Sequence, residues 1–326
     1  MASNQYVMIK TPSGEVKGKA PFIISASRST DIPAFYSEWF FNRLEKGYCA
    51  WRNPYNDSKI YVSFENCHGI VFWTKNPKPI LPYLHILDER DIKYYFQYTL
   101  NDYDKEGFEP NVDRLSDRIE TFKELSDLVG PDRIIWRFDP IMVTDYLTPR
   151  DILKKIWNIG NQIKKCTNKL VFSFIDLYGK TRINMAKHLM MFVDHVDKIS
   201  PGEEQRKEII EGLVKIRDRW HLEGWNIEFA TCAEGFDYDE YGIKHNKCID
   251  NELFLKISQG DDEFVDYLSN ATKASGQRKL CGCINSQDVG SYNTCKHFCT
   301  YCYANTDREC VLEKIKSHDA DNESIV

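Results

Sequence analysis

Short apolar runs alternate along the chain with longer stretches in which apolar residues recur at a helical period. Six runs are rich in Ile, Val, Phe, Tyr or Trp, the residues that favour β-strands. We expect strands at Phe22–Ser27, Ile70–Thr74, Tyr94–Thr99, Arg133–Phe138, Leu170–Ile175 and Asn226–Thr231. Strands that alternate with helices form parallel sheets. The pattern predicts an α/β fold, most simply a full or partial (β/α) barrel of the TIM type with about six parallel strands. A doubly wound open sheet is the alternative.

The stretches between these strands carry residues that begin and end helices. We expect helices over Pro33–Lys46, over Val112–Val129, from Thr148 and Pro149 onward, and over Glu203–His221. Asp31 and Asn111 stand where N-caps belong, and Gly47 and Gly130 follow the first two helices. The strand and helix signals together support repeated strand–helix units.

Polar side chains gather where the predicted strands end. In a parallel barrel those ends open onto one face, where such folds place their chemistry. The candidate residues at this face are Arg28, Thr30, Asp31, Lys75, Gln97, Arg137, Asp139, Asp176 and Glu234. Loops after strands are polar in any case, and Asp31 and Asp139 suit caps or turns equally well. Arg137 and Gln97, however, lie inside apolar runs, where an unpaired polar group is costly. As a set, the residues indicate a polar site, with Arg28, Lys75, Arg137 and Asp139 as candidate catalytic groups.

The chain divides by composition into three parts. Residues 1–235 form the predicted barrel, with a hairpin turn at Thr11–Glu15 near the start. Residues 236–316 are rich in cysteine, and we expect this extension to fold over the C-terminal ends of the strands. Residues 317–326 are polar and acidic, so we expect disorder there.

Composition narrows the functional classes. The 326 residues are 42% apolar, and no run approaches the roughly 20 apolar residues that span a bilayer. With no signal peptide at the N-terminus, we expect a cytoplasmic protein without a membrane partner. The net charge of −6 argues against nucleic acid as a partner, without excluding it. Eleven cysteines in a reducing compartment indicate metal ligands or redox groups.

Three of these cysteines stand within eight residues, at Cys295, Cys299 and Cys302. Three thiols so close together are poorly explained as buried hydrophobic residues without a chemical role. In addition, Cys-x-x-Cys is a common metal-binding spacing. A zinc site built from Cys281, Cys283, Cys299 and Cys302 would leave Cys295 without a role. In the alternative grouping of the cysteines, the three close ones bind an iron–sulfur cluster. One iron of the cluster, here called the open iron, then has no protein ligand. The remaining candidates, Cys232, Cys248, Cys281 and Cys283, then form a second site for a 4Fe-4S cluster or zinc.

The sequence resembles known proteins at this point. Cys295, Cys299 and Cys302, with the aromatic Tyr301 before the last cysteine, resemble the signature of the radical S-adenosylmethionine superfamily. The segments Ile24–Pro33, Phe72–Pro77 and Trp136–Pro140, with the cysteine-rich tail, resemble a bacterial family of unknown function (domain of unknown function 1848). That family carries such a cysteine cluster at its C-terminus. The resemblance covers nearly the whole chain.

The superfamily resemblance implies a particular chemistry. S-adenosyl-L-methionine would bind the open iron of a 4Fe-4S cluster, and its reductive cleavage would give a 5′-deoxyadenosyl radical that takes hydrogen from a substrate. Arg28, Thr30, Asp31, Gln97, Asp176, Glu234 and Tyr301 are the candidate cofactor-binding residues. The expected partners are a small-molecule or peptide substrate and an electron donor such as ferredoxin or flavodoxin.

Two features differ from the usual superfamily pattern. The cysteine loop follows all six strands instead of the first one, so the resemblance implies a circular permutation. In addition, Phe72–Asn76 stands where the superfamily carries a Gly-Gly-Glu motif that receives the amino group of the cofactor.

Two other classes of function therefore stay open. One is an iron–sulfur protein for electron transfer or redox sensing. The other is a barrel hydrolase or nucleic-acid repair protein with structural zinc. The eight histidines form no recognisable ligand pair, so catalytic zinc is the least favoured hypothesis.

Overall fold

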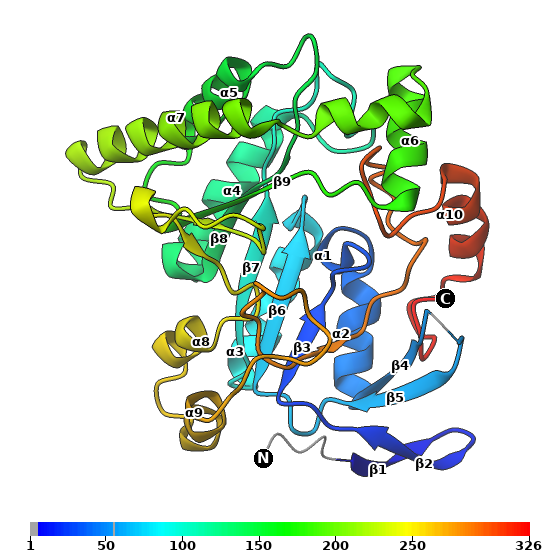
Figure 1. The fold of residues 1–326 in the computed structure, drawn as a ribbon. Coiled ribbons are helices and arrows are strands. Elements are labelled where there is room, and N and C mark those ends of the chain that lie inside the picture. The colour runs from blue at the N-terminus through cyan, green and yellow to red at the C-terminus, as the bar shows by residue number, and fades with distance from the viewer. Residues whose placement is uncertain (1–5, 55) are drawn as a thin grey trace.

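The computed structural model describes residues 6–54 and 56–326, and a parallel sheet of eight strands forms its centre (Figure 1). The strands lie in the order β11-β10-β9-β8-β7-β6-β3-β12, and every ladder in this row is parallel. Their bounds are β3 Ile23–Ala26, β6 Gly69–Thr74, β7 Lys93–Thr99, β8 Ile134–Ile141, β9 Lys169–Phe174, β10 Glu228–Thr231, β11 Lys244–His245 and β12 Gln287–Asp288. The structure is therefore a mixed α/β fold around one large parallel sheet.

The six strands predicted from apolar runs are confirmed, and they pair in chain order from β3 to β10. Their boundaries differ from the predicted ones by only a few residues. The edge strands β11 and β12 are additional. Each has two residues, which is too short for an alternating or continuous apolar pattern to be recognised.

Ten α-helices and five short 3-10 helices occur in the described part of the chain. The α-helices are α1 Ile32–Phe35, α2 Ser37–Lys46, α3 Leu84–Glu89, α4 Leu115–Val129, α5 Pro149–Gln162, α6 Gly179–Leu189, α7 Glu203–Leu222, α8 Asn251–Ile257, α9 Asp262–Ser269 and α10 Arg308–Lys314. The 3-10 helices are η1 Lys78–Tyr83, η2 Pro131–Arg133, η3 Val193–Ile199, η4 Asp239–Tyr241 and η5 Ile315–Ser317. The four predicted helical stretches are all present.

One predicted helix is corrected. The stretch Pro33–Lys46 is two helices, α1 and α2, that meet at Tyr36. Tyr36 has φ −139°, outside the helical range, and its buried side chain donates a hydrogen bond to the carbonyl oxygen of Thr294 at 2.6 Å. The helix thus breaks at the residue that contacts Thr294, which lies 258 positions away in the sequence. No local sequence pattern could indicate this contact.

A second, smaller sheet lies at the base of the molecule (Figure 1). Its order is β1-β2-β5-β4, with β1 Tyr6–Thr11, β2 Gly14–Lys19, β4 Tyr48–Arg52 and β5 Lys59–Ser63. The predicted N-terminal hairpin is confirmed as β1 and β2, which pair in antiparallel register. The strands β4 and β5 were not predicted.

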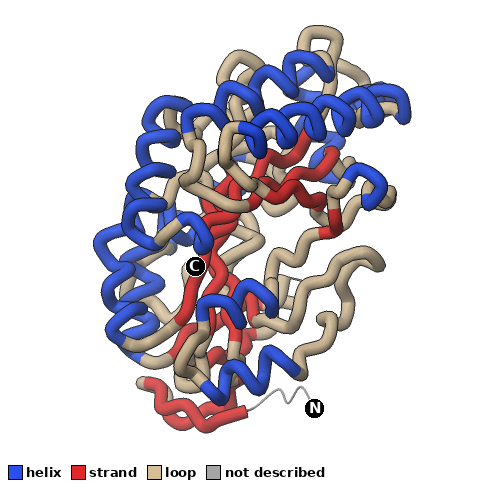
Figure 2. Tube along the Cα trace, turned by 90° about the vertical axis from the view of Figure 1, so that its left-hand side faces the viewer, coloured by secondary structure: helices blue, strands red, loops and turns tan. Residues whose placement is uncertain are grey.

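Alternate residues of the large sheet face two separate cores. Phe72, Phe96 and Trp136 point to the core that contains the helices α2, α4, α5 and α7. Val71 and Tyr95 point to the other core, which Phe254 of α8 and Phe264 of α9 complete. Figure 2 shows helices along one side of the sheet and long loop segments along the other. Both faces of the sheet are covered, as expected for parallel strands.

The last residues of the chain are packed against the small sheet. The backbone of Ala50 donates a hydrogen bond to Glu323 O at 2.6 Å, and the Trp39 indole donates to Asn322 O at 2.9 Å. Ile325 is 2% exposed. The polar composition of residues 317–326 predicted disorder, but these contacts give the segment a defined position.

Candidate functional site

A cavity of about 700 Å³ lies at the C-terminal ends of the parallel strands. This volume is in the range of small-molecule sites. The predicted site residues that line it are Arg28, Thr30, Asp31, Lys75, Arg137, Asp139, Asp176, Tyr301 and the cysteines at 232, 248, 281, 283, 295, 299 and 302. The fold thus brings seven cysteines to the face where the strands β3, β6, β8, β9 and β10 end.

Cys295, Cys299 and Cys302, here called the three-thiol loop, form one wall of this cavity. The loop turns tightly at Phe298, which has φ +56°, and the Cys302 amide donates a hydrogen bond to Cys299 O at 3.1 Å. Burial raises the pKa of all three thiols, and that of Cys299 rises to about 12. The three thiols are therefore protonated at neutral pH, and a metal ion that binds them would have to displace their protons.

Contacts with distant segments hold the three-thiol loop in place. His297 Nε2 lies 2.8 Å from Asp31 Oδ2, and both side chains are almost fully buried. The Thr300 amide donates to Phe108 O at 2.9 Å, and Thr181 of α6 donates its hydroxyl to Tyr301 O at 3.3 Å. The loop is thus attached to the end of β3, to the segment after β7 and to α6.

A buried ion pair lies behind the three-thiol loop. Lys75 Nζ is 2.7 Å from Glu109 Oε1, and their side chains are 13% and 0% exposed. Lys75 also donates to the Tyr301 hydroxyl at 2.9 Å, and Tyr301 in turn donates to Glu109. Burial alone would raise the pKa of Glu109, but Lys75 and Arg118 lower it to about 2. The carboxylate is therefore ionised, and the pair fixes Tyr301 in one orientation.

Cys232, Cys248, Cys281 and Cys283, here called the four-thiol group, come from three separate segments. The sulfurs of Cys232 and Cys248 are 3.4 Å apart, and the Cys248 amide donates to Cys283 Sγ at 3.1 Å. Hydrogen bonds from Cys283 lower the pKa of the Cys281 thiol to about 6. The four thiols form a continuous chain of neighbours, so the predicted grouping is brought together by the fold.

Arg137 joins the four-thiol group to the end of β8. Its guanidinium donates to Cys248 Sγ at 3.2 Å, to Gln97 Oε1 at 3.1 Å and to Asp139 Oδ2 at 3.1 Å. Gln97 also donates to Cys248 O at 3.1 Å. The two polar residues inside apolar strands thus find their partners at Cys248, which is why they are tolerated there.

Two predicted site residues do not line the cavity. Gln97 lies behind Arg137, where it contacts Arg137 and the backbone of Cys248. Glu234 accepts a hydrogen bond from the Phe174 amide at 2.8 Å and ties the loop after β10 to the end of β9. Burial raises the pKa of Glu234 to about 7. Both residues support the wall of the site from outside.

The structure adds residues that the sequence did not indicate. Glu109 lies in the loop after β7, and its pairing with Lys75 depends on the tertiary fold. Asp288 of β12 accepts hydrogen bonds from Ser25, from Ser27 and from the Arg28 amide, each at 2.9 Å. No nearby sequence pattern indicates that Glu109 or Asp288 belongs to the site. His297 lies inside the cysteine loop, and this position is the one feature of the sequence that could have indicated its place in the site.

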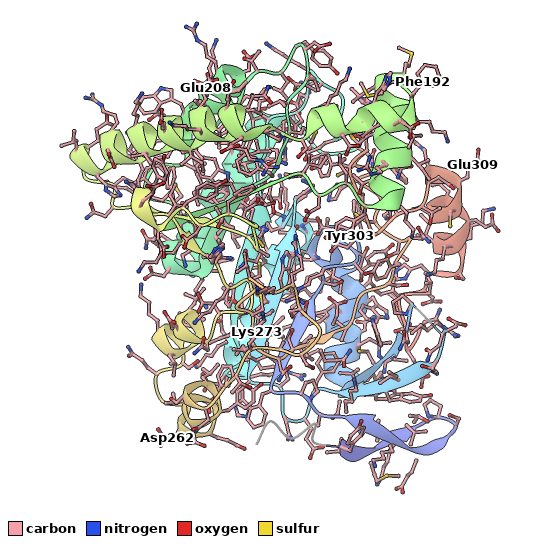
Figure 3. All side chains as sticks on the ribbon, viewed as in Figure 1. Phe192, Glu208, Asp262, Lys273, Tyr303 and Glu309 are labelled. Atoms are coloured by element: carbon pink, nitrogen blue, oxygen red, sulfur yellow. The ribbon has the colours of Figure 1, made fainter. Side chains whose placement is uncertain are left out.

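Figure 3 shows Tyr303 near the C-terminal ends of the central strands and Lys273 in the segment that crosses in front of the sheet. Tyr303 directly follows the three-thiol loop, lines the cavity and donates its hydroxyl to Arg28 O at 2.6 Å. Lys273 pairs through its backbone with Ile284, beside the four-thiol group. The two thiol groups thus approach the cavity on neighbouring parts of the C-terminal third of the chain.

The described part of the chain has neither a preformed metal site nor a helix that could span a membrane. Within residues 6–54 and 56–326, no group of three or more His, Cys, Asp or Glu side chains is arranged so that it could hold a metal ion as it stands. No helix of the described chain has the length and apolar character needed to cross a membrane. All eleven cysteines are free of disulfide bonds.

Comparisons with known proteins give a family but little else. No curated protein matches the chain. Among solved structures, a crystal structure of dihydropyrimidinase from Brevibacillus agri NCHU1002 is similar at 11% identity, with a TM-score of 0.24. The match covers 86% of this chain and 54% of that one, so the chain spans about half the length of the enzyme. A family model described as "Domain of unknown function (DUF1848)" matches residues 23–304, and the chain belongs to this family.

Proposed function

We propose that this protein is an iron–sulfur enzyme of the radical S-adenosylmethionine type. The observation that carries the proposal is the presence of seven cysteines around one cavity at the strand ends. Three come from a single loop with the spacing of a cluster-binding motif, and four come from three segments that meet. We interpret the large sheet as a partial barrel, and residues 236–316 as the cysteine-rich extension that covers its mouth.

Two groups of cysteines are the candidates for holding metal centres, and their side chains would have to move closer together to do so. Cys295, Cys299 and Cys302 would hold a 4Fe-4S cluster with one open iron, because they have the spacing of a cluster-binding loop and line the same wall of the cavity. When bound, this cluster and S-adenosyl-L-methionine supply a 5′-deoxyadenosyl radical that takes a hydrogen atom from a substrate. The four-thiol group would hold a second 4Fe-4S cluster or a zinc ion.

The side chains of this chain bind, orient and exclude water. Lys75 and Glu109 hold the Tyr301 hydroxyl, so that the aromatic ring beside Cys302 keeps one position. His297 and Asp31 hold the loop against β3. Arg137 donates to Cys248 and so stabilises negative charge on the four-thiol group. A ferredoxin or flavodoxin would supply the electron, and the substrate is a small molecule or peptide.

One experiment tests this proposal. The protein is purified without oxygen, its iron and sulfide per chain are measured, and S-adenosylmethionine is added with a strong reductant. We expect bound iron and sulfide and the formation of 5′-deoxyadenosine. Protein that contains stoichiometric zinc and no iron after this treatment would overturn the proposal.

A second candidate function is electron transfer between two iron–sulfur clusters. The observation that favours it is that both thiol groups line the same cavity, which would place two redox centres near each other. This candidate predicts the same iron and sulfide content but no 5′-deoxyadenosine. The product measurement therefore separates the two functions.

A further inference from the structure

Charged side chains line the cavity almost entirely as internal pairs. Four pairs involve lining residues: Lys75 with Glu109, Arg137 with Asp139, His297 with Asp31, and Arg278 with Asp176. In each pair the carboxylate and the basic group lie within salt-bridge distance. The three pairs that contain Lys or Arg therefore present little net charge to a molecule that enters the cavity.

Arg28 is the exception among the charged lining residues, all of which the structure describes. Its backbone is anchored, because its amide donates to Asp288 and its carbonyl accepts from Tyr303. Its guanidinium has no hydrogen bond or ion pair within the described chain. It stacks on the ring of Trp73, with the guanidinium carbon 5.2 Å from the ring centroid. This cation–π contact holds the guanidinium over Trp73 while its N–H groups stay available.

A second unpartnered group lies two residues from Arg28. Thr30 is 5% exposed and also lines the cavity, and its hydroxyl oxygen has no hydrogen-bond partner. A buried hydroxyl without a partner is unfavourable by about 1–3 kcal/mol, so native structures rarely retain one without a reason. A bound ligand would satisfy the Thr30 hydroxyl and the Arg28 guanidinium together.

Arg28 has neighbours in the four-thiol group and also contacts Tyr303, the residue that follows the three-thiol loop. Burial lowers the pKa of Arg28, but Cys283, Cys248 and Asp288 raise it, and the net shift is upward. Its cysteine neighbours thus belong to the four-thiol group. The cation beside Cys299 is Lys75, and Glu109 already neutralises it.

We propose that Arg28 and Thr30 bind a carboxylate group of the substrate in the cavity at the strand ends. This inference rests on the proposed function, because it takes the carboxylate of the cofactor to lie at the three-thiol loop. A planar carboxylate matches the fork of a guanidinium. A carboxylate would add one negative charge beside Asp288, whereas a phosphate monoester would add about −1.5 to −2.

The test is anion binding by the anaerobically purified full chain, with its iron content recorded. The midpoint of thermal unfolding is measured against acetate, against its neutral analogue acetamide, and against inorganic phosphate at constant ionic strength. We expect acetate to raise the midpoint in a saturable way, by about 2 °C at ten times its dissociation constant. Acetamide has no effect, and phosphate binds more weakly than acetate.

Variants assign the effect to the two residues. Arg28→Gln abolishes the acetate shift, Arg28→Lys weakens acetate binding about tenfold because the fork is lost, and Thr30→Val weakens it severalfold. Arg133→Gln is the matched control, since Arg133 also stacks on an aromatic ring, that of Tyr94, but lies outside the cavity. This control keeps the shift of the natural chain. Circular dichroism confirms that each variant is folded.

Three results would overturn the inference: no saturable acetate shift in the natural chain, an undiminished shift in folded Arg28→Gln and Thr30→Val, or tighter binding of phosphate than of acetate. The midpoint of thermal unfolding reports anion binding to the folded chain, and it does not depend on 5′-deoxyadenosine formation. Protein that binds acetate through Arg28 but forms no 5′-deoxyadenosine would contradict the proposed function alone. Active protein without acetate binding would contradict this inference alone.

Discussion

The two thiol groups of this protein are built in opposite ways. The three-thiol loop takes all its cysteines from residues 295–302, and its spacing is visible in the sequence. The four-thiol group takes Cys232 from the end of β10, Cys248 from the segment after β11, and Cys281 and Cys283 from a later loop. One site is a local motif held by distant contacts, and the other exists only because distant segments meet.

The difference extends to the charges behind each group. The three-thiol loop is backed by Lys75 and Glu109, a pair in which the carboxylate is fully buried. The four-thiol group receives the Arg137 guanidinium directly on Cys248 Sγ. A thiolate at Cys248 would therefore be stabilised by a cation in contact, whereas Lys75 near the three-thiol loop is already neutralised by Glu109.

The largest expected effect comes from removing one cysteine from each group. We predict that Cys299→Ala loses roughly half of the bound iron and reduces 5′-deoxyadenosine formation to background. If both sites hold 4Fe-4S clusters, Cys248→Ala loses a similar share of iron and leaves the three-thiol site loaded. Iron analysis and product measurement check both variants. Cys310→Ala, which changes a cysteine outside both groups, is the control. Complete iron loss in both variants would mean that the groups are one shared site.

The next largest effect concerns the ion pair behind the three-thiol loop. Glu109→Gln leaves the buried Lys75 and Arg118 without their carboxylate, and we predict a destabilisation of about 3–5 kcal/mol in denaturant unfolding. Glu313→Gln is the matched control, because Glu313 pairs with Lys316 in the open, at 75% and 71% exposure. The control changes stability by less than about 0.5 kcal/mol. Equal effects in the two variants would contradict the role of the buried pair.

The same carboxylate predicts a pH dependence. Its pKa is lowered from 4.5 to about 2 in the folded chain, so its stabilising contribution is complete above about pH 4.5 and is lost as the pH falls toward 2. The contribution is at most about 3 kcal/mol. Unfolding free energies measured between pH 5 and pH 2 should decrease more steeply for the natural chain than for Glu109→Gln. Parallel curves would show that Glu109 does not titrate in this window.

The smallest effect tests the segment that runs from the four-thiol group to the three-thiol loop. A Cβ at Gly290 would lie 1.9 Å from Ser27 Oγ and 2.5 Å from Ser27 Cβ. We predict that Gly290→Ala is destabilising by about 1–3 kcal/mol, because the close approach of this segment to β3 is disturbed. Gly179→Ala, where a Cβ meets nothing within 4 Å, should change stability by less than about 0.5 kcal/mol. Chemical denaturation of both variants measures the difference.

Sequence reasoning was most successful where burial imposes a pattern. The six central strands are buried on both faces, so their runs of apolar residues identify them. Most of the polar residues just after those strands lie together at one cavity, since parallel strands place their C-terminal ends together. Arg28, Lys75 and Arg137 line the cavity for this reason.

Where the predicted and observed positions of site residues differ, contacts between distant segments of the chain are the reason. Gln97 was expected in the site, but the Cys248 carbonyl covers it. Glu234 was also expected there, but its carboxylate turns to the backbone of Phe174. Glu109 was missed, because nothing near it in the sequence indicates a partner on another strand.

The sequence by itself determined the class of fold and the three-thiol loop, because strand burial and cysteine spacing are short-range patterns written in neighbouring residues. The tertiary structure decided the rest. It brought the four-thiol group together, paired Lys75 with Glu109, and left Arg28 as the charged lining residue without a partner. Hydrogen bonds and ion pairs act over a few ångströms in space, and only the fold determines which side chains come that close.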